Sequence, residues 1–85
     1  MAAYATFETM SNNLKRLRKE RHLSQPALAK RAGICENTIY AYESGRREGL
    51  LLHWLLLADA LGVTLADLAT PYDGGGGNIE EEADY

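Results

Sequence analysis

Basic side chains that could bind phosphate are confined to one stretch of this 85-residue chain. All nine lysines and arginines lie between Lys15 and Arg47, where only three acidic residues accompany them, so this window carries a net charge of +6. The rest of the chain holds nine acidic residues and brings the total charge to −3. Such asymmetry favours a basic binding surface with an acidic tail, although a solvated charged face would give the same composition.

Residues with catalytic or metal-binding chemistry are few and scattered. His22 and His53 lack the spacing of metal ligands, and no Ser/His/Asp or Cys/His arrangement stands out. The single cysteine, Cys35, excludes an intrachain disulfide and a zinc site built from cysteines. Glycines 74–77 lack the strand, lysine and helix of a phosphate-binding loop. We therefore expect no enzymatic activity, no metal and no cofactor.

The elements that would position the basic side chains are two short helices within residues 24–45. Ser24 is a good N-cap for the first of them. Gly33 suits a turn, because a left-handed backbone costs it little. The second helix is expected from about residue 35 to 44, with Gly45 as its stop. Such a pair forms a helix-turn-helix unit, whose second helix can enter the major groove of DNA.

Three more helices complete an all-α prediction of about five helices. The first runs from about residue 9 or 11 to residue 21, the fourth covers residues 50–61, and Thr64 caps a short fifth helix. In the fourth helix the expected core stripe is Leu51, Trp54, Leu55, Ala58 and Leu61. In the first three helices the expected buried residues are Leu14, Leu17, Leu28, Ala29, Ile39 and Tyr42.

The chain divides by composition into three parts. Residues 1–8 form an N-terminal arm, residues 9–71 the helical domain, and residues 72–85 a glycine-rich linker with an acidic tail. No run of 18 or more apolar residues is present, and the first residues lack the basic start and apolar centre of a signal peptide. We expect a cytoplasmic protein without membrane contact.

Short motifs between residues 14 and 68 follow one another in an order and spacing typical of a known family. They are Leu14-x-x-Leu17-Arg18, Leu23-Ser24-Gln25, Leu28-Ala29, Ala32-Gly33-Ile34, Thr38-Ile39, Glu43-Ser44-Gly45-Arg46 and Leu57-Ala58-x-Ala60-Leu61-Gly62-Val63. In these motifs the chain resembles the Cro/lambda-repressor-like (XRE-like) helix-turn-helix regulators. The resemblance implies a compact five-helix domain that binds double-stranded DNA.

The resemblance also implies which residues contact DNA. The base-facing positions of the third helix would be Glu36, Asn37, Tyr40 and Ala41. Among them the amide of Asn37 is the best candidate for direct readout, because it can pair with adenine, whereas Ala41 could contact only a thymine methyl. The DNA backbone would be contacted by Gln25, Thr38, Ser44, Arg46 and Arg47, together with Lys15 on the first helix. The alternative for each is a solvent-facing helix residue.

Three positions of the resemblance concern the structure that holds the third helix. Arg18 and Glu43 would form a partly buried ion pair between the first and third helices. Cys35 stands where a Ser or Thr cap is usual; it is either a tolerated small residue or a redox-active thiol. Gly49 replaces a frequent proline, which should loosen the loop before the fourth helix.

Leucines outside the expected core stripe suggest a second apolar face on the fourth helix. Leu50, Leu52 and Leu56 occupy positions that are usually polar in the family, and Leu52 and Leu56 share a helix face. Exposed apolar patches mark interfaces, so we interpret these leucines as a homodimer or partner surface. The alternative is that the N-terminal arm or the tail packs on them.

Together these features predict a sequence-specific regulator of transcription. It would be a repressor of phage, mobile-element or stand-alone type that binds an inverted repeat as a homodimer. The alternative is a protein-interaction module, such as an antitoxin, that binds its partner through the apolar face of the fourth helix and the acidic tail.

Overall fold

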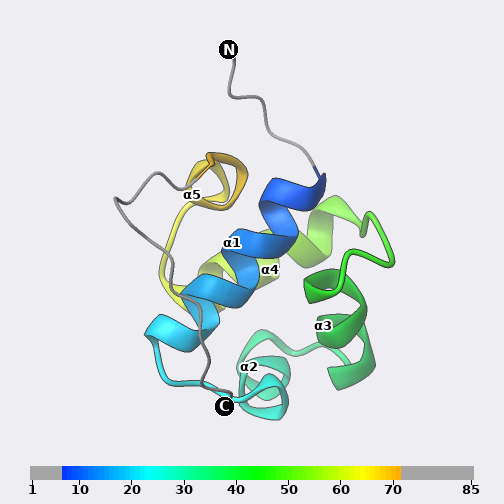
Figure 1. The fold of residues 1–85 in the computed structure, drawn as a ribbon. Coiled ribbons are helices and arrows are strands. Elements are labelled where there is room, and N and C mark those ends of the chain that lie inside the picture. The colour runs from blue at the N-terminus through cyan, green and yellow to red at the C-terminus, as the bar shows by residue number, and fades with distance from the viewer. Residues whose placement is uncertain (1–6, 72–85) are drawn as a thin grey trace.

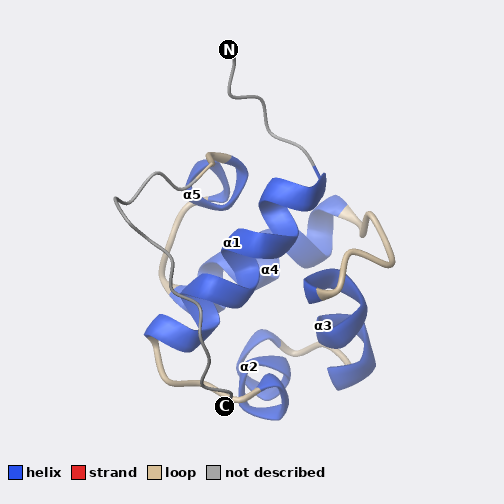
Figure 2. Ribbon diagram, viewed as in Figure 1, coloured by secondary structure: helices blue, strands red, loops and turns tan. Residues whose placement is uncertain are grey.

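The computed structural model describes residues 7–71, whose regular structure is entirely helical (Figures 1 and 2). The helices are α1 (Phe7–Glu20), α2 (Gln25–Ala32), α3 (Glu36–Glu43), α4 (Leu51–Leu61) and α5 (Leu65–Ala69). The predicted all-α class is confirmed, and only the start of α1 differs by more than one residue from its expected position. The predicted acidic tail lies outside the described residues. Within them, no helix is long and apolar enough to cross a membrane.

Helix α1 runs across α4 and separates the remaining helices (Figure 1). Helices α2 and α3 pack together on one side of α1, and α5 lies on its other side. Between them lies one core, formed by Leu14, Leu17, Leu28, Ala29, Ala32, Ile39, Tyr42, Trp54, Leu57, Ala58, Leu61 and Leu68. All the residues expected to be buried in α1, α2 and α3 are in this core.

The predicted core stripe of α4 is partly wrong. Leu51 and Leu55 are 64% and 45% exposed, whereas Leu57, which was not assigned to the stripe, is fully buried. The observed stripe, Trp54, Leu57, Ala58 and Leu61, has the same i, i+3, i+4, i+7 spacing but begins three residues later, which turns the buried face by about 60° around the helix axis. Because almost every residue of α4 is apolar, periodicity alone cannot choose between the two registers.

Local hydrogen bonds explain where the short helices begin. The Ser24 hydroxyl accepts from the Ala27 N–H at 3.1 Å and caps α2. Thr64 and Asp67 form a reciprocal capping box at α5, with distances of 2.9 and 3.0 Å. The Thr64 N–H, and then its hydroxyl, hold the pKa of Asp67 below its usual value. Cys35 occupies the N-cap of α3 but makes no capping hydrogen bond with its side chain.

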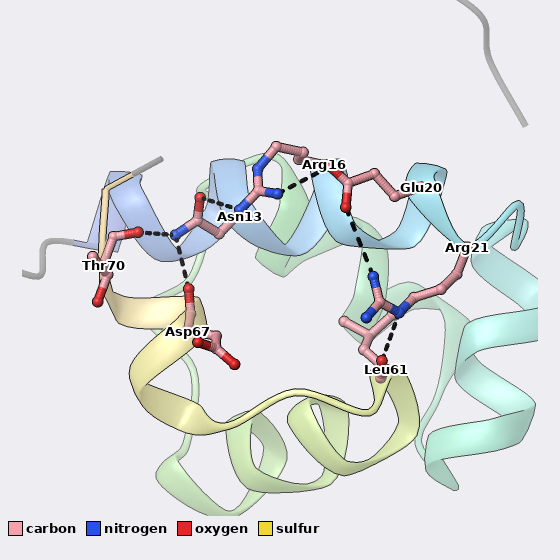
Figure 3. Close-up of polar contacts among 7 residues, drawn as sticks. All are labelled: Asn13, Arg16, Glu20, Arg21, Leu61, Asp67 and Thr70. Atoms are coloured by element: carbon pink, nitrogen blue, oxygen red, sulfur yellow. Dashed lines mark hydrogen bonds and ion pairs between the residues drawn. The ribbon is translucent and has the colours of Figure 1, made fainter. Parts of the chain in front are cut away.

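Asn13 of α1 and Arg21, which directly follows the last residue of α1, bind the ends of α5 and α4 (Figure 3). Asn13 is buried, and its Nδ2 donates to the carbonyl oxygens of Leu68 at 2.8 Å and Thr70 at 2.7 Å. Arg21 Nε donates to the Leu61 carbonyl at 2.6 Å, next to the end of α4. These bonds satisfy carbonyl groups that have no partner within their own helices. Arg21 therefore serves the fold, and its basic charge alone did not reveal this.

Candidate nucleic-acid interface

Glu43, the last residue of α3, joins three helices through one carboxylate. It accepts from Arg18 on α1, with Nε–Oε2 at 2.6 Å and Nη2–Oε1 at 3.0 Å. It also accepts from Gln25 Nε2, at the start of α2, at 3.1 Å. The side chains of Arg18 and Glu43 are each only 4% exposed, so this is a buried, two-point ion pair. The carboxylate thus fixes the end of α3 against α1 and α2.

The inner face of α3 is held by Ile39 and Tyr42, which are both in the core. The Tyr42 ring stacks on the Trp54 ring of α4, with 5.1 Å between centroids and 18° between planes. The Tyr42 hydroxyl accepts from the Leu50 N–H at 3.1 Å and lies 2.6 Å from His53 Nδ1. These contacts tie α3 to the beginning of α4 and leave the opposite face of α3 outward.

The outer face of α3 carries the residues that the sequence placed against DNA bases. Glu36, Asn37 and Tyr40 are exposed, and Ala41 is partly buried. A shallow hollow of about 480 Å³ lies on this face, and its lining is Asn37, Tyr40, Ala41, Arg46 and Arg47. The structure therefore brings three of the four base-facing candidates together with two arginines, while Glu36 is not part of the hollow.

The residues after α3 turn back onto this outer face. Gly45 has a left-handed backbone, with φ of 77°, and its N–H donates to the Tyr42 carbonyl at 3.3 Å. The Arg46 N–H donates to the Ala41 carbonyl at 2.9 Å, and the Ser44 hydroxyl donates to the same carbonyl at 3.1 Å. The guanidinium carbon of Arg46 lies 5.7 Å from the centroid of the Tyr40 ring.

The other residues expected to contact the DNA backbone lie at more varied positions. Gln25 is partly exposed, and its amide group has a second N–H besides the one donated to Glu43. Thr38 is partly buried on α3, Arg47 is exposed, and Lys15 is exposed on α1 but does not line the hollow. Gln25 can thus brace α3 and still offer a donor to a phosphate.

The leucines that form the exposed apolar surface of α4 are not the same as those expected from the sequence. Leu50, Leu51, Leu52 and Leu55 are 45–64% exposed, and we refer to these four residues as the leucine surface. Leu56, which was expected with Leu50 and Leu52, is partly buried. The reason is the register of α4, which turns Leu51 and Leu55 outward and Leu57 inward.

Residues 7–71 contain no group of three or more His, Cys, Asp or Glu side chains that could hold a metal ion. Cys35 is a free, exposed thiol.

Helices α2 and α3 are short and are joined by a turn at Gly33. The outer face of α3 is exposed, and its inner face is held by the core. This arrangement defines the helix-turn-helix class of proteins. The sequence profile of the helix-turn-helix family HTH_3 matches residues 14–68. The chain belongs to this family of DNA-binding transcriptional regulators.

Two similar proteins span most of the chain. The uncharacterized HTH-type transcriptional regulator y4dJ of Sinorhizobium fredii is 36% identical over 64 residues, which are 75% of this chain and 83% of that protein. The restriction-modification controller protein C.AhdI of Aeromonas hydrophila is 32% identical, with a TM-score of 0.71 over 76% of this chain and 98% of that chain.

The same fold also occurs within a longer enzyme. The hydroxypropylphosphonic acid epoxidase of S. wedmorenis is 28% identical, with a TM-score of 0.67, and the match covers 79% of this chain but only 35% of that one. Because one fold can serve different functions, the function of this chain has to be argued from its exposed residues and not from its helices alone.

Proposed function

We propose that this protein binds double-stranded DNA sequence-specifically and represses transcription, with α3 in the major groove. The observation that carries the proposal is the outer face of α3, where an amide, a phenol and two arginines surround one hollow. The residues beneath this face are buried and braced, so its side chains are presented by a rigid helix. A rigid helix with polar side chains on its outer face is what major-groove reading requires.

Within this proposal the side chains of α3 and its surroundings have separate roles. Asn37 reads adenine, and Glu36, Tyr40 and Ala41 face the neighbouring base edges. Gln25, Thr38, Ser44, Arg47 and Lys15 contact sugar and phosphate, which positions the protein but carries no sequence information.

The local charge supports phosphate contact despite the net charge of −3. Arg16, Arg18 and Arg21 bind Glu20, Glu43 and the Leu61 carbonyl respectively. Lys30, Arg31, Arg46 and Arg47 are exposed and have no ion pair within residues 7–71. These four cations around α2 and α3, together with Lys15 and Lys19 of α1, which also have no ion pair within residues 7–71, remain for phosphate.

Salt dependence of binding tests this proposal. If about five phosphates are neutralised, a plot of log K against log salt should have a slope of about −4 to −5. Fluorescence anisotropy with a labelled duplex measures the slope. The competing acidic charge of the tail is removed in a variant with Glu80, Glu81 and Glu82 changed to Gln and Asp84 changed to Asn. If neither the wild-type chain nor this variant binds DNA at low salt, the proposal is contradicted. That result would instead favour the protein-interaction module.

We infer that the leucine surface is the interface of a homodimer. A two-fold interface places the same patch of both subunits in contact. An uncharged patch suits this arrangement, because a charged patch would face a patch of the same charge. The four leucines carry no charge, and such exposed patches mark interfaces. A dimer would place one α3 in each half of an inverted repeat, about one DNA turn apart.

A charged substitution on the leucine surface should separate the subunits. Leu52 is 62% exposed, so Leu52→Glu leaves the fold intact but buries a carboxylate in the dimer. We expect the dimer dissociation constant to rise by at least about tenfold, measured by sedimentation equilibrium. Ala66→Glu, on the exposed face of α5, adds the same charge and serves as the control. Equal dissociation constants for the two variants would contradict this interface.

A further inference from the structure

Arg46 follows α3 in sequence but lies on the surface of α3 in the structure. Its N–H donates to the Ala41 carbonyl at 2.9 Å, while Gly45 closes the turn with a hydrogen bond to Tyr42. This pair of bonds is that of a Schellman turn, which returns the chain to the last turn of the helix. The backbone of Arg46 is therefore positioned by α3 itself.

The side chain of Arg46 is directed by the Tyr40 ring. Its guanidinium carbon lies 5.7 Å from the ring centroid, a distance at which a cation is attracted by an aromatic face. Within residues 7–71 Arg46 has no ion pair, so its in-plane N–H groups are not occupied by a carboxylate. A guanidinium held over a ring keeps these donors available and has less freedom to lose on binding.

The hollow around Ala41 gives this guanidinium a place next to the base-facing residues. Ala41 is too short to reach a base with a polar group, and Arg46 lines the same hollow as Ala41, Asn37 and Tyr40. In the major groove, guanine presents O6 and N7 as adjacent acceptors that a guanidinium can contact together.

We propose that Arg46 reads a guanine in each half-site and so supplies the specificity that Ala41 cannot. This inference rests on the proposed function, namely DNA binding with α3 in the major groove. It moves Arg46 from the expected backbone contacts, which carry no sequence information, to the residues that determine specificity.

The test uses a duplex recovered by selection from a random DNA pool. Each guanine is replaced in turn by 7-deazaguanine, which lacks the N7 acceptor. At one guanine per half-site, replacement by 7-deazaguanine should lower the affinity of the wild-type chain about tenfold. The Arg46→Ala variant should bind the guanine and 7-deazaguanine duplexes equally at that position. Arg47→Ala is the matched control, because Arg47 lines the same hollow but has no contact with an aromatic ring within residues 7–71. It should weaken selected and scrambled duplexes equally and keep the 7-deazaguanine effect.

Variants of Tyr40 test the positioning of the guanidinium. Tyr40→Phe keeps the aromatic face and should preserve the 7-deazaguanine effect, whereas Tyr40→Leu should reduce it. Uniform weakening by Arg46→Ala with the 7-deazaguanine effect intact would overturn the inference and leave DNA binding itself standing. A selected half-site without a G·C pair would do the same. Failure of the wild-type chain to bind any duplex would instead overturn the proposed function and, with it, this inference.

Discussion

Replacing Glu43 by alanine is expected to destabilise the protein by about 3–5 kcal/mol, because it leaves a buried guanidinium without its carboxylate. Arg18 and Glu43 are 4% exposed, and the carboxylate accepts three hydrogen bonds from Arg18 and Gln25. A domain of this size has a total stability of only about 5–10 kcal/mol, so much of it would be lost. Urea unfolding followed by circular dichroism measures the change.

Glu48→Ala provides the matched control for charge. Glu48 is an exposed residue of the loop between α3 and α4, and its side chain has no ion pair within residues 7–71. We expect this variant to change stability by less than about 0.5 kcal/mol. The double variant Arg18→Met, Glu43→Leu should regain most of the loss, because it removes both buried charges. If Glu43→Ala and Glu48→Ala destabilise equally, the carboxylate does not hold α3 in place.

Replacing Gly49 by alanine should have the second large effect, about 2–5 kcal/mol of lost stability. Gly49 has a φ of 86°, and a Cβ atom there would lie 2.6 Å from Trp54 Nε1 and 2.8 Å from Tyr42 Cζ. Both rings are buried and stacked on each other, so neither can move aside without disturbing the core. Thermal unfolding would report the loss. The residue expected to loosen its loop is therefore closely packed against two core side chains.

Gly62→Ala separates the effect of backbone strain from that of the missing space. Gly62 has a similar φ of 74°, but a Cβ atom there would meet nothing within 4 Å. It should cost only about 1–2 kcal/mol, the usual penalty for a left-handed alanine. Equal losses at the two glycines would show that the rings give way and that the close packing of Gly49 contributes nothing.

Most of the fold could be predicted from local signals. Ser24 and Thr64 cap their helices as the sequence indicates, and the inward residues of α1, α2 and α3 have polar neighbours that define their faces. Helix α4 lacks that contrast, which is why Leu57 was missed and Leu55 misplaced. The role of Asn13 could not be predicted, because its carbonyl partners lie 55 and 57 residues away along the chain.

The candidate site was predictable as a helix face but not as an arrangement of side chains. Ile39 and Tyr42 point inward, so Asn37 and Tyr40 must point outward on the same helix. The position of the Arg46 guanidinium over the Tyr40 ring depends on how the chain turns after α3. Gly45 signals that a turn is present, but the sequence does not show which side chain the turn places over the ring.

In vitro selection from a random duplex pool tests most directly whether α3 reads a DNA sequence. The proposed function predicts recovery of an inverted repeat with half-sites about one DNA turn apart, containing an adenine contacted by Asn37. The Asn37→Ala variant should lose about 1–3 kcal/mol on this duplex and little on scrambled DNA. A pool that gains no common sequence, or an Asn37→Ala variant that weakens all duplexes alike, would contradict sequence reading by α3.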